Sequence, residues 1–454
     1  MASRTEFASK LGLIAATVGS AVGLGNVWRF PAETQANGGA TFLLLYIVCT
    51  LLLGIPVMLG EFVLGRGGRS DAIGVFRKLS PGKKWWLAGA GGILASYLIV
   101  IFYMVVAGWT LEYLVGSLTG QFYTSWGLAP AGEDKTQYLA TMTEMVTGVW
   151  PPILATAAVI AINIAILLRG VQKGIERLSN VLMPLLFVIL LIMCAVSLTL
   201  PEAADGVAFF LKPDFSKVTP LAVMDALGQT FFSLSLGMGI LITYASYYPI
   251  TTNLPRTSLT VVLLSLMVAL LMGLVIFPAV TSFGLQDESL EGATLIFVTL
   301  PQVFGHLPLS WLWSALFFIL LLVAAITSTV SLSEVAIAFL CDTFGLSRRR
   351  AVLLALCPMF ILSSICSLSM GPLNDVRLLG MNMFDLLDNF ATNILLPLVA
   401  ISTCIYLGWF APKTLLREQL TNEGKLRSHL VKPVAFILRW VAPALILLIL
   451  LGNL

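Results

Sequence analysis

The sequence predicts an all-α integral membrane protein in which eleven helices cross the bilayer as a single domain. Two observations support this fold class. Of the 454 residues, 58% are hydrophobic and only 11% are charged, whereas a soluble domain carries about 25% charged residues. The apolar residues also gather into runs of about 20, the length that a helix needs to cross the hydrocarbon core.

Eleven apolar runs have this length, and Ser, Gly or acidic residues interrupt the sixth and the tenth. The first run is Gly-rich and continues into Arg29 and Glu33, so we expect a retained span rather than a cleaved signal peptide. The expected spans are 11–36, 41–65, 86–119, 150–168, 174–199, 220–250, 257–283, 309–341, 350–369, 379–408 and 433–452.

The basic residues predict how the spans are oriented, because Lys and Arg accumulate in cytoplasmic connections. With a cytoplasmic N-terminus, 20 of the 26 Lys and Arg fall on the cytoplasmic side, four on the other side and two within spans. We therefore expect a multi-pass protein of the cell membrane with its N-terminus inside and, after eleven spans, its C-terminus outside.

Composition disfavours several other functions. Two His and six scattered Cys, with no C-x-x-C pair, argue against a metal enzyme or a disulfide scaffold. A net charge of +3 from dispersed basic residues argues against a nucleic-acid partner. No nucleophile–base pair is evident, so we expect no enzyme and no catalytic residue, and nothing indicates an obligatory protein partner.

The first span contains a stretch that a lipid-facing helix should not contain. Three Gly residues alternate between Gly19 and Gly25, and Asn26 and Arg29 follow closely. Gly weakens a helix, and unwound backbone is tolerated at membrane depth only where it lines a protein cavity. Close packing through small residues is the alternative, but Asn26 and Arg29 favour a break in the helix.

The sixth span repeats this pattern between Phe232 and Gly239. Two interrupted spans, five helices apart, are typical of an inverted-repeat transporter, in which broken helices offer N–H groups to an anion and carbonyls to cations. Hydropathy alone thus places one repeat at about 11–199 and the other at about 220–408, with 433–452 outside both.

Further polar residues lie within the second, third, eighth and tenth spans. Thr327 and Ser328 could bond back to their own helix or, with a carbonyl one turn earlier, offer oxygens to a small cation. Glu61 is deep enough to need a buried partner, for which the break in the sixth span is the candidate. Asp385 and Asp388 share a helix face, whereas Glu112 and Glu334 are given no role.

At these residues the chain resembles the neurotransmitter:sodium symporter family. The matching stretches are Gly19–Pro31 with Asn37-Gly38-Gly39, Ser233–Gly239 with Thr243–Tyr247, Gly60-Glu61-Phe62 and Ile276-Phe277-Pro278. The similarity covers nearly the whole chain, apart from a missing twelfth helix. It implies the LeuT-type fold, a five-plus-five inverted repeat with discontinuous helices 1 and 6.

The resemblance implies two sodium sites. The first comprises the Ala21 carbonyl, Asn26, Ser233, the substrate carboxylate and, where relatives have Asn or Asp, Ser265. The second comprises the carbonyls of Gly19, Val22 and Ala324 and the hydroxyls of Thr327 and Ser328. Ala269 stands where chloride-dependent members carry Ser, which argues against a chloride requirement, although Tyr46, Gln229 and Ser233 are retained.

The resemblance also implies a substrate site for an amino acid. The N–H groups of Leu24 and Gly25 with the Tyr103 hydroxyl would hold the carboxylate, and carbonyls near Ser20, Phe232 and Ser235 the ammonium. The side-chain pocket would consist of Ile99, Phe232, Met238 and Leu332. Gly23 replaces the Asp of monoamine carriers, and an apolar pocket with few polar groups suits a neutral hydrophobic or aromatic amino acid.

Two gates follow from the same resemblance. Arg29 and Asp388 resemble an outer ion pair above the aromatic lid Phe232, and Arg4 with Asp342 and Tyr247 resembles an inner latch. Independently of the family, Gly174 and Pro184 predispose the fifth span to unwind at its cytoplasmic end, which would let water reach the second sodium site. An ordinary proline kink is the alternative.

The sequence therefore predicts sodium-coupled uptake of amino acids by alternating access. Two alternatives on the same scaffold stay open, namely an ion channel and an amino-acid sensor that does not transport. Saturable turnover would exclude the channel, and uptake into proteoliposomes would exclude the sensor.

Overall fold

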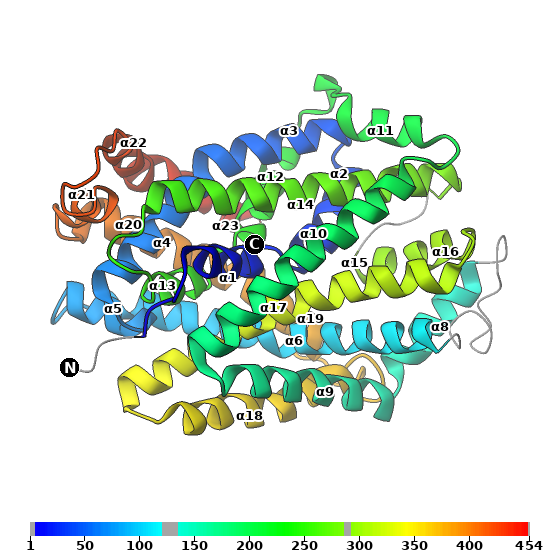
Figure 1. The fold of residues 1–454 in the computed structure, drawn as a ribbon, viewed down its shortest axis with the longest axis horizontal. Helices are drawn as coiled ribbons and strands as arrows, with labels where there is room; N and C mark the ends of the chain where they lie inside the picture. Colours follow the sequence, from blue (N-terminus) through cyan, green and yellow to red (C-terminus); the bar gives the residue numbers. More distant parts are fainter. Residues whose placement is uncertain (1–4, 120–134, 286–291, 453–454) are drawn as a thin grey trace.

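The computed structural model describes residues 5–119, 135–285 and 292–452, and helices form nearly all of this part of the chain. The long helices run side by side along the longest axis of the molecule (Figure 1). The first half comprises α1 (Lys10–Ala21), η1 (Gly25–Arg29), α2 (Phe30–Ala36), α3 (Ala40–Cys49), η2 (Thr50–Gly54), α4 (Ile55–Gly68), α5 (Ala72–Leu79), α6 (Trp86–Leu118), α8 (Lys135–Thr147), α9 (Trp150–Leu167), η3 (Val171–Glu176), α10 (Arg177–Ser197), α11 (Ala203–Leu211) and η4 (Phe215–Lys217).

The second half is built in the same manner. It comprises α12 (Pro220–Ser233), α13 (Ile240–Ala245), α14 (Leu254–Ser282), α15 (Gly292–Thr294), η5 (Leu295–Thr299), α16 (Leu300–Gly305), α17 (Ser310–Phe344), α18 (Arg348–Leu368), α19 (Met383–Asn389), η6 (Phe390–Leu395), α20 (Leu396–Ile405), η7 (Tyr406–Phe410), α21 (Leu415–Leu420), α22 (Val431–Phe436), η8 (Ile437–Val441) and α23 (Ala442–Gly452).

Among the described residues, nine helical segments are long and apolar enough to cross a membrane. A tenth span results if α1 and the segment Gly25–Ala36 count together, although they are bent by 52° at the break between them. The remaining expected span, 220–250, corresponds to α12 and α13, which are separated by the non-helical residues 234–239. Both spans that the sequence predicted to be broken are thus interrupted.

Local sequence signals set several helix ends. The hydroxyl of Ser9 accepts the N–H of Gly12 at the start of α1, and Thr219 caps α12 just before Pro220. Side-chain caps satisfy N–H groups that have no partner inside the helix. At the other end of α17, Gly345 takes a left-handed conformation (φ 64°), which is the common way to end a helix with Gly.

The centre of the bundle is formed by α17 and α6, which pack along each other and are the most buried of the long helices. Around them, α1 packs against α10, α14 and α17, while α13 packs against α4 and α17. The two interrupted spans therefore lie against the central helices, where unwound backbone is shielded from lipid.

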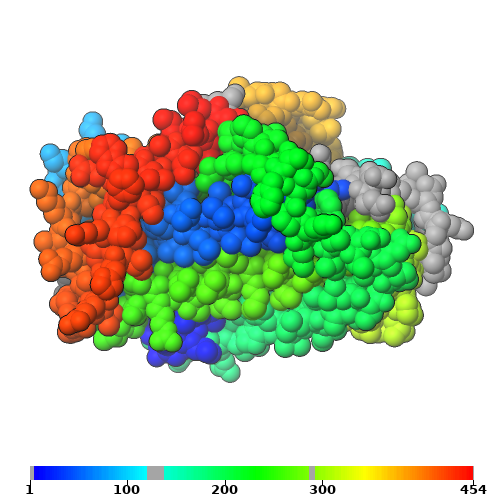
Figure 2. Space-filling view, turned by 90° about the horizontal axis from the view of Figure 1, so that it is seen from above, coloured from blue at the N-terminus to red at the C-terminus, as the bar shows by residue number. Residues whose placement is uncertain are grey.

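The two ends of the molecule differ in charge. The end that carries α5, α21 and α22, on the left of Figure 1, holds the basic connections and is called the basic end here. The connections with α8, α11 and α16 lie on the right, at the opposite end. In Figure 2 the C-terminal segment, in orange and red, covers part of the outer surface and reaches the basic end.

Candidate functional site

The break in the first span begins where α1 ends at Ala21. Val22 has an extended conformation (φ −97°, ψ 101°), and the chain resumes helical winding as the wide turn η1 from Gly25. The carbonyls at the end of α1 and the N–H groups at the start of η1 thus approach one region from opposite sides. Such half-helix ends carry partial charges that suit an anion and cations.

The break in the sixth span lies directly beside it. Ser235, Gly237 and Gly239 all have positive φ (54°, 78° and 70°), a conformation that Gly adopts without steric cost. A Cβ on Gly237 would lie 2.7 Å from the carbonyl oxygen of Leu396. The hydroxyl of Ser235 donates to the carbonyl of Ser20 at 2.6 Å, so the two breaks are joined directly.

Glu61 on α4 stabilises the second break. Its Oε1 accepts the N–H of Gly237 at 2.7 Å, and the side chain is only 1% exposed. The prediction that this buried carboxylate contacts the broken sixth span is therefore confirmed.

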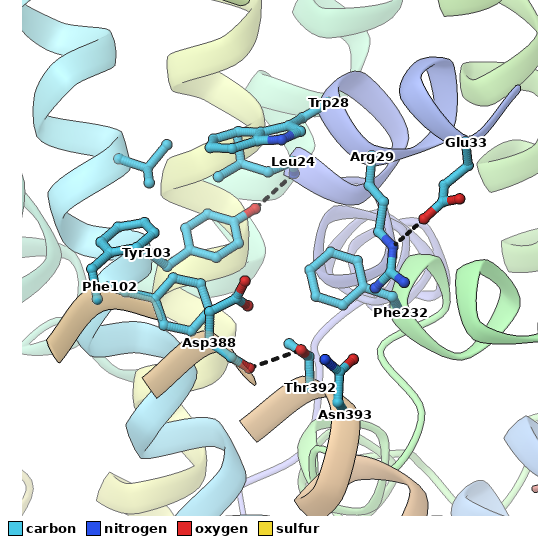
Figure 3. A pocket seen from close by; sticks show the side chains of 12 residues that line it. Leu24, Trp28, Arg29, Glu33, Phe102, Tyr103, Phe232, Asp388, Thr392 and Asn393 are labelled. Carbon is cyan, nitrogen blue, oxygen red and sulfur yellow. Dashed lines mark hydrogen bonds and ion pairs between the residues drawn. The ribbon is translucent and has the colours of Figure 1, made fainter. Parts of the chain in front are cut away.

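A cavity lies between the two breaks, and eight of the nine residues expected to contact substrate line it. The ninth, Leu24, lines a larger vestibule that Tyr103 and Phe232 also border (Figure 3). The vestibule has a cavity volume of about 270 Å³ and the inner cavity one of about 20 Å³, so the inner cavity is nearly closed. The eight inner residues are Ser20, Gly25, Ile99, Tyr103, Phe232, Ser235, Met238 and Leu332.

One side of this cavity is polar, and the backbone of Gly23 lies close against its polar groups. The Tyr103 hydroxyl accepts the N–H of Leu24 at 2.7 Å. A Cβ on Gly23 would lie 2.6 Å from both this hydroxyl and Oγ of Ser328. No side chain therefore fits at position 23 without displacing these groups, which agrees with the absence there of the acidic residue of monoamine carriers.

The residues of the first expected sodium site are brought together. Asn26 is fully buried, and its amide nitrogen donates to Oγ of Ser265 at 3.2 Å and to the Ala21 carbonyl at 3.4 Å. Its Oδ1 is buried with no hydrogen-bond partner in the described part of the chain. Ser233 lies beyond it, bonded to the Tyr46 hydroxyl at 2.8 Å.

The residues of the second expected site lie where α1 meets α17. Gly19 faces Thr327, since a Cβ on it would lie 3.2 Å from the Thr327 Cβ, and Gly23 faces Ser328. The Thr327 hydroxyl donates to the carbonyls of Val323 and Ala324 in its own helix, which is the alternative to cation binding given above for this residue. Ser328 Oγ, however, is buried with no hydrogen-bond partner of standard geometry among the described residues.

The expected outer ion pair is not formed in this structure. Arg29 instead pairs with Glu33, one turn along the same helix, at 3.3 Å, and its guanidinium lies 5.6 Å from the centre of the Phe232 ring. Asp388 faces this group across the vestibule (Figure 3). Arg29 pairs with Glu33 rather than with Asp388 because the open vestibule separates Arg29 from Asp388.

The expected inner latch falls only partly within the described residues. Arg4 lies outside the described residues, and Asp342 accepts the backbone N–H of Asp71 at 2.7 Å. The Tyr247 hydroxyl donates to Glu334 at 2.8 Å, and Arg348 binds both oxygens of the same carboxylate at 2.7 and 2.6 Å. Sequence reasoning gave Glu334 no role, although a fully buried carboxylate in a span requires such a partner.

The N-terminal segment closes this end of the molecule over the tyrosines of the sixth span. Phe7 is buried, donates its N–H to the Tyr247 carbonyl at 3.1 Å and packs its ring against Tyr244 and Tyr248. Glu176 on η3 accepts the N–H groups of Ala8 and Ser9 at 2.8 and 3.0 Å and the Ser9 hydroxyl at 2.7 Å. Nothing in the sequence pattern indicated this role of Glu176.

Known proteins show the same organisation. The model of the sodium:neurotransmitter symporter family matches residues 4–129 and 135–454. An uncharacterized sodium-dependent transporter of Bacillus subtilis, YhdH, is 36% identical over 98% of this chain and 97% of its own length. The sodium-dependent dopamine transporter of Bos taurus is 29% identical over 90% of this chain and 63% of its own. This chain also matches the crystal structure of MhsT in complex with L-phenylalanine. The match covers 100% of both chains, with 40% sequence identity and a TM-score of 0.89.

Proposed function

Because the chain belongs to the sodium:neurotransmitter symporter family and is a sodium-dependent transporter rather than an enzyme, we propose that it carries a neutral hydrophobic or aromatic L-amino acid into the cell together with sodium. The observation that carries this proposal is the cavity between the two breaks, which combines a polar wall with an apolar one. The similarity over the full chain to MhsT, whose structure holds L-phenylalanine, supports the choice of substrate class.

The substrate carboxylate would bind at the polar wall. The N–H groups of Leu24 and Gly25 start the second half of the broken helix, and a helix N-terminus attracts an anion. The Tyr103 hydroxyl, which accepts the Leu24 N–H, would donate its own proton to a carboxylate oxygen. Position 23 offers no carboxylate of its own, so the substrate must supply the negative charge.

The rest of the substrate would bind the opposite walls. The carbonyls near Ser20, Phe232 and Ser235 suit an ammonium group, while Ile99, Met238 and Leu332 form an apolar surface. Phe232 lies between this cavity and the vestibule and would cover a bound side chain. A cavity that is mostly apolar and has a few fixed polar groups selects a substrate by shape and by its two charged ends.

Two sodium ions would be carried with the substrate, since hard cations prefer oxygen ligands. The unpartnered Asn26 Oδ1, with the Ala21 carbonyl, Ser233 and Ser265, would bind one ion that also touches the substrate carboxylate. The buried Ser328 Oγ, with Thr327 and the carbonyls of Gly19, Val22 and Ala324, would bind the other. Because Ser265, where relatives have Asn or Asp, is neutral, the first ion would depend on the charge of the substrate carboxylate.

The transport cycle would alternate between the two ends of the molecule. With the basic end in the cytoplasm, as the positive-inside rule requires, the vestibule faces outward and receives the substrate. Pairing of Arg29 with Asp388 over Phe232 would close this side. Release of the inner contacts, including Arg4 with Asp342 and Tyr247, and unwinding between Gly174 and Pro184 would then open the cytoplasmic side.

Uptake of labelled L-phenylalanine into proteoliposomes tests this proposal. We expect saturable uptake that an inward sodium gradient drives and that stops when potassium replaces sodium. Sodium-dependent binding without uptake would indicate a sensor, flux that does not saturate would indicate a channel, and uptake that is equal in potassium would contradict the sodium coupling.

The variant Asn26→Ala tests the shared ion site. Coupled ligands change each other's affinity by the same factor, typically 5- to 150-fold, so this variant should lose sodium affinity and substrate affinity together. Asn163→Ala is a matched control, because Asn163 is equally buried but bonds to Val159 in its own helix α9. Loss of only one affinity in the Asn26 variant would contradict a shared site.

A further inference from the structure

An arginine stands on the outer surface of the last span, where it contacts two tryptophans. The guanidinium of Arg439 lies 3.9 Å from the ring centre of Trp409 and 5.6 Å from that of Trp440. The rings of Trp409 and Trp440 are 45% and 53% exposed and meet edge to face at 4.6 Å. Within the described part of the chain, no hydrogen bond or ion pair engages this guanidinium, so its donors face outward from the protein.

The position of this group along the membrane normal is fixed by contacts of the backbone. Trp409 lies in η7, the last turn of the tenth span, and its indole N–H donates to the Arg439 carbonyl at 3.2 Å. A Cβ on Gly408 would lie 2.6 Å from the Arg439 Cα, so the two helices touch at this point. Arg439 therefore lies level with the end of a span, at the depth where Trp rings and lipid headgroups are found.

The same helix face carries a second cation and more apolar surface. Lys432 precedes Arg439 by seven residues, which places both on one face two turns apart, and Lys432 is exposed in the first turn of α22. Phe436 lies between them and is 59% exposed. This face is called the Arg439 face below, and it comprises Lys432, Phe436, Arg439 and Trp440 together with Trp409.

The connection that leads into α22 adds positive charge. Residues 411–432 contain five Lys and Arg and two Glu, and all five basic side chains are exposed: Lys413, Arg417, Lys425, Arg427 and Lys432. This segment and α22 lie at the basic end (Figures 1 and 2). Juxtamembrane basic groups of this kind attract anionic lipid headgroups.

We propose that the Arg439 face binds the phosphate of an anionic glycerophospholipid in the leaflet at the basic end. Arginine matches phosphate geometry through two parallel N–H donors, and the tryptophans hold the guanidinium in place while leaving its outer edge open. Exposed Phe436 and the apolar surface of α23 accommodate acyl chains. A soluble phosphate or a peptide lacks the acyl chains that such a surface takes up.

Lipid binding to the purified, detergent-solubilised full chain tests this proposal. The probes are phosphatidylglycerol, phosphatidylcholine and glycerol 3-phosphate, and the readouts are the number of lipids retained in native mass spectrometry and the rise in melting temperature. We expect wild type to retain phosphatidylglycerol about fivefold better than phosphatidylcholine. Arg439→Gln should lose most of this preference, since one basic group near a membrane surface changes affinity by about that factor.

Matched variants separate this site from general surface charge. Lys212→Gln removes an exposed cation at the opposite end of the molecule and should leave the preference unchanged. Arg439→Lys keeps the charge but loses the paired donors, so its preference should be intermediate, which also reports on the site if Arg439→Gln does not fold. Equal retention by wild type and both Arg439 variants, or competition by glycerol 3-phosphate as strong as by the lipid, would overturn the proposal.

Discussion

The two ends of the molecule are held in opposite states. At the basic end, the buried carboxylate of Glu334 is bound by Arg348 and Tyr247, and Phe7 is packed among tyrosines below the sixth-span break. At the opposite end, Arg29 pairs with its own neighbour Glu33, and a vestibule separates it from Asp388. One end is therefore closed by buried, interlocked contacts, and the other is open and lined by groups that can still pair.

This difference shows which contacts hold the resting conformation. Buried charge pairs are costly to break because each partner is left without compensation, whereas exposed pairs contribute at most about 1 kcal/mol. The closed end should therefore respond strongly to single substitutions and the open end weakly.

Replacing the buried carboxylate, Glu334→Gln, should have the largest effect. It leaves the Arg348 guanidinium without its counter-charge, a loss that costs about 3–5 kcal/mol in a buried pair. We expect at least a tenfold loss of uptake and increased labelling, from the cytoplasmic side, of a cysteine placed at Ser331. The double variant Glu334→Gln/Arg348→Gln serves as control and should recover much of the stability, because neither charge remains alone. A single variant indistinguishable from wild type would show that this pair does not hold the closed end.

The second effect concerns the N-terminal anchor. Glu176→Gln retains the shape of the side chain but removes the charge that accepts three hydrogen bonds from Ala8 and Ser9, and such charge-assisted bonds contribute about 1.5–3 kcal/mol. Amide hydrogen exchange of residues 5–12 should accelerate tenfold or more, while Asp205→Asn at the other end should leave it unchanged. If exchange in this segment does not change, Glu176 does not anchor the N-terminus.

A smaller effect is expected at the open end for Asp388→Asn. This substitution removes the charge that would pair with Arg29 when the vestibule closes, so bound substrate should dissociate about two- to fivefold faster, as expected for a pair near the surface. Dissociation of labelled substrate from the purified protein in sodium measures this rate. A loss as large as that of Glu334→Gln would contradict the contrast between the two ends.

The smallest effect is expected for Glu33→Gln, and it should have the opposite sign. The Arg29–Glu33 pair holds the arginine away from Asp388 and is an i,i+4 pair that contributes about 0.3–0.5 kcal/mol. Releasing Arg29 should favour closure and slow substrate dissociation by up to about twofold. Faster dissociation in this variant would show that Glu33 helps to close the vestibule rather than to keep it open.

The sequence predicted the parts of the site that depend on local pattern. Alternating Gly residues followed by Asn26 predicted the first break, and the need of Glu61 for a buried donor predicted its contact with the second break, which Gly237 provides. These predictions succeed because unwound backbone and buried charge are rare enough in a membrane span to indicate their own environment.

Ion-pair and hydrogen-bond partners that are brought together only by the placement of separate helices could not be predicted from local pattern. Glu334 and Arg348 belong to different helices on either side of Gly345, and only the turn between them brings the charges together. Arg29 had two carboxylates within reach, and the width of the vestibule decides between Glu33 and Asp388. Glu176 was overlooked because its partners are backbone N–H groups, which leave no trace in side-chain chemistry.

The proposed mechanism requires that the two helix breaks together bind substrate and sodium. Equilibrium binding of labelled L-phenylalanine to the purified protein, measured over a range of sodium concentrations, is the most direct test of this requirement. We expect substrate affinity to rise at least fivefold as sodium replaces potassium. Asn26→Ala should abolish this rise, and Asn163→Ala should preserve it. Affinity that is independent of sodium in wild type, or a sodium effect that survives in the Asn26 variant, would contradict the mechanism.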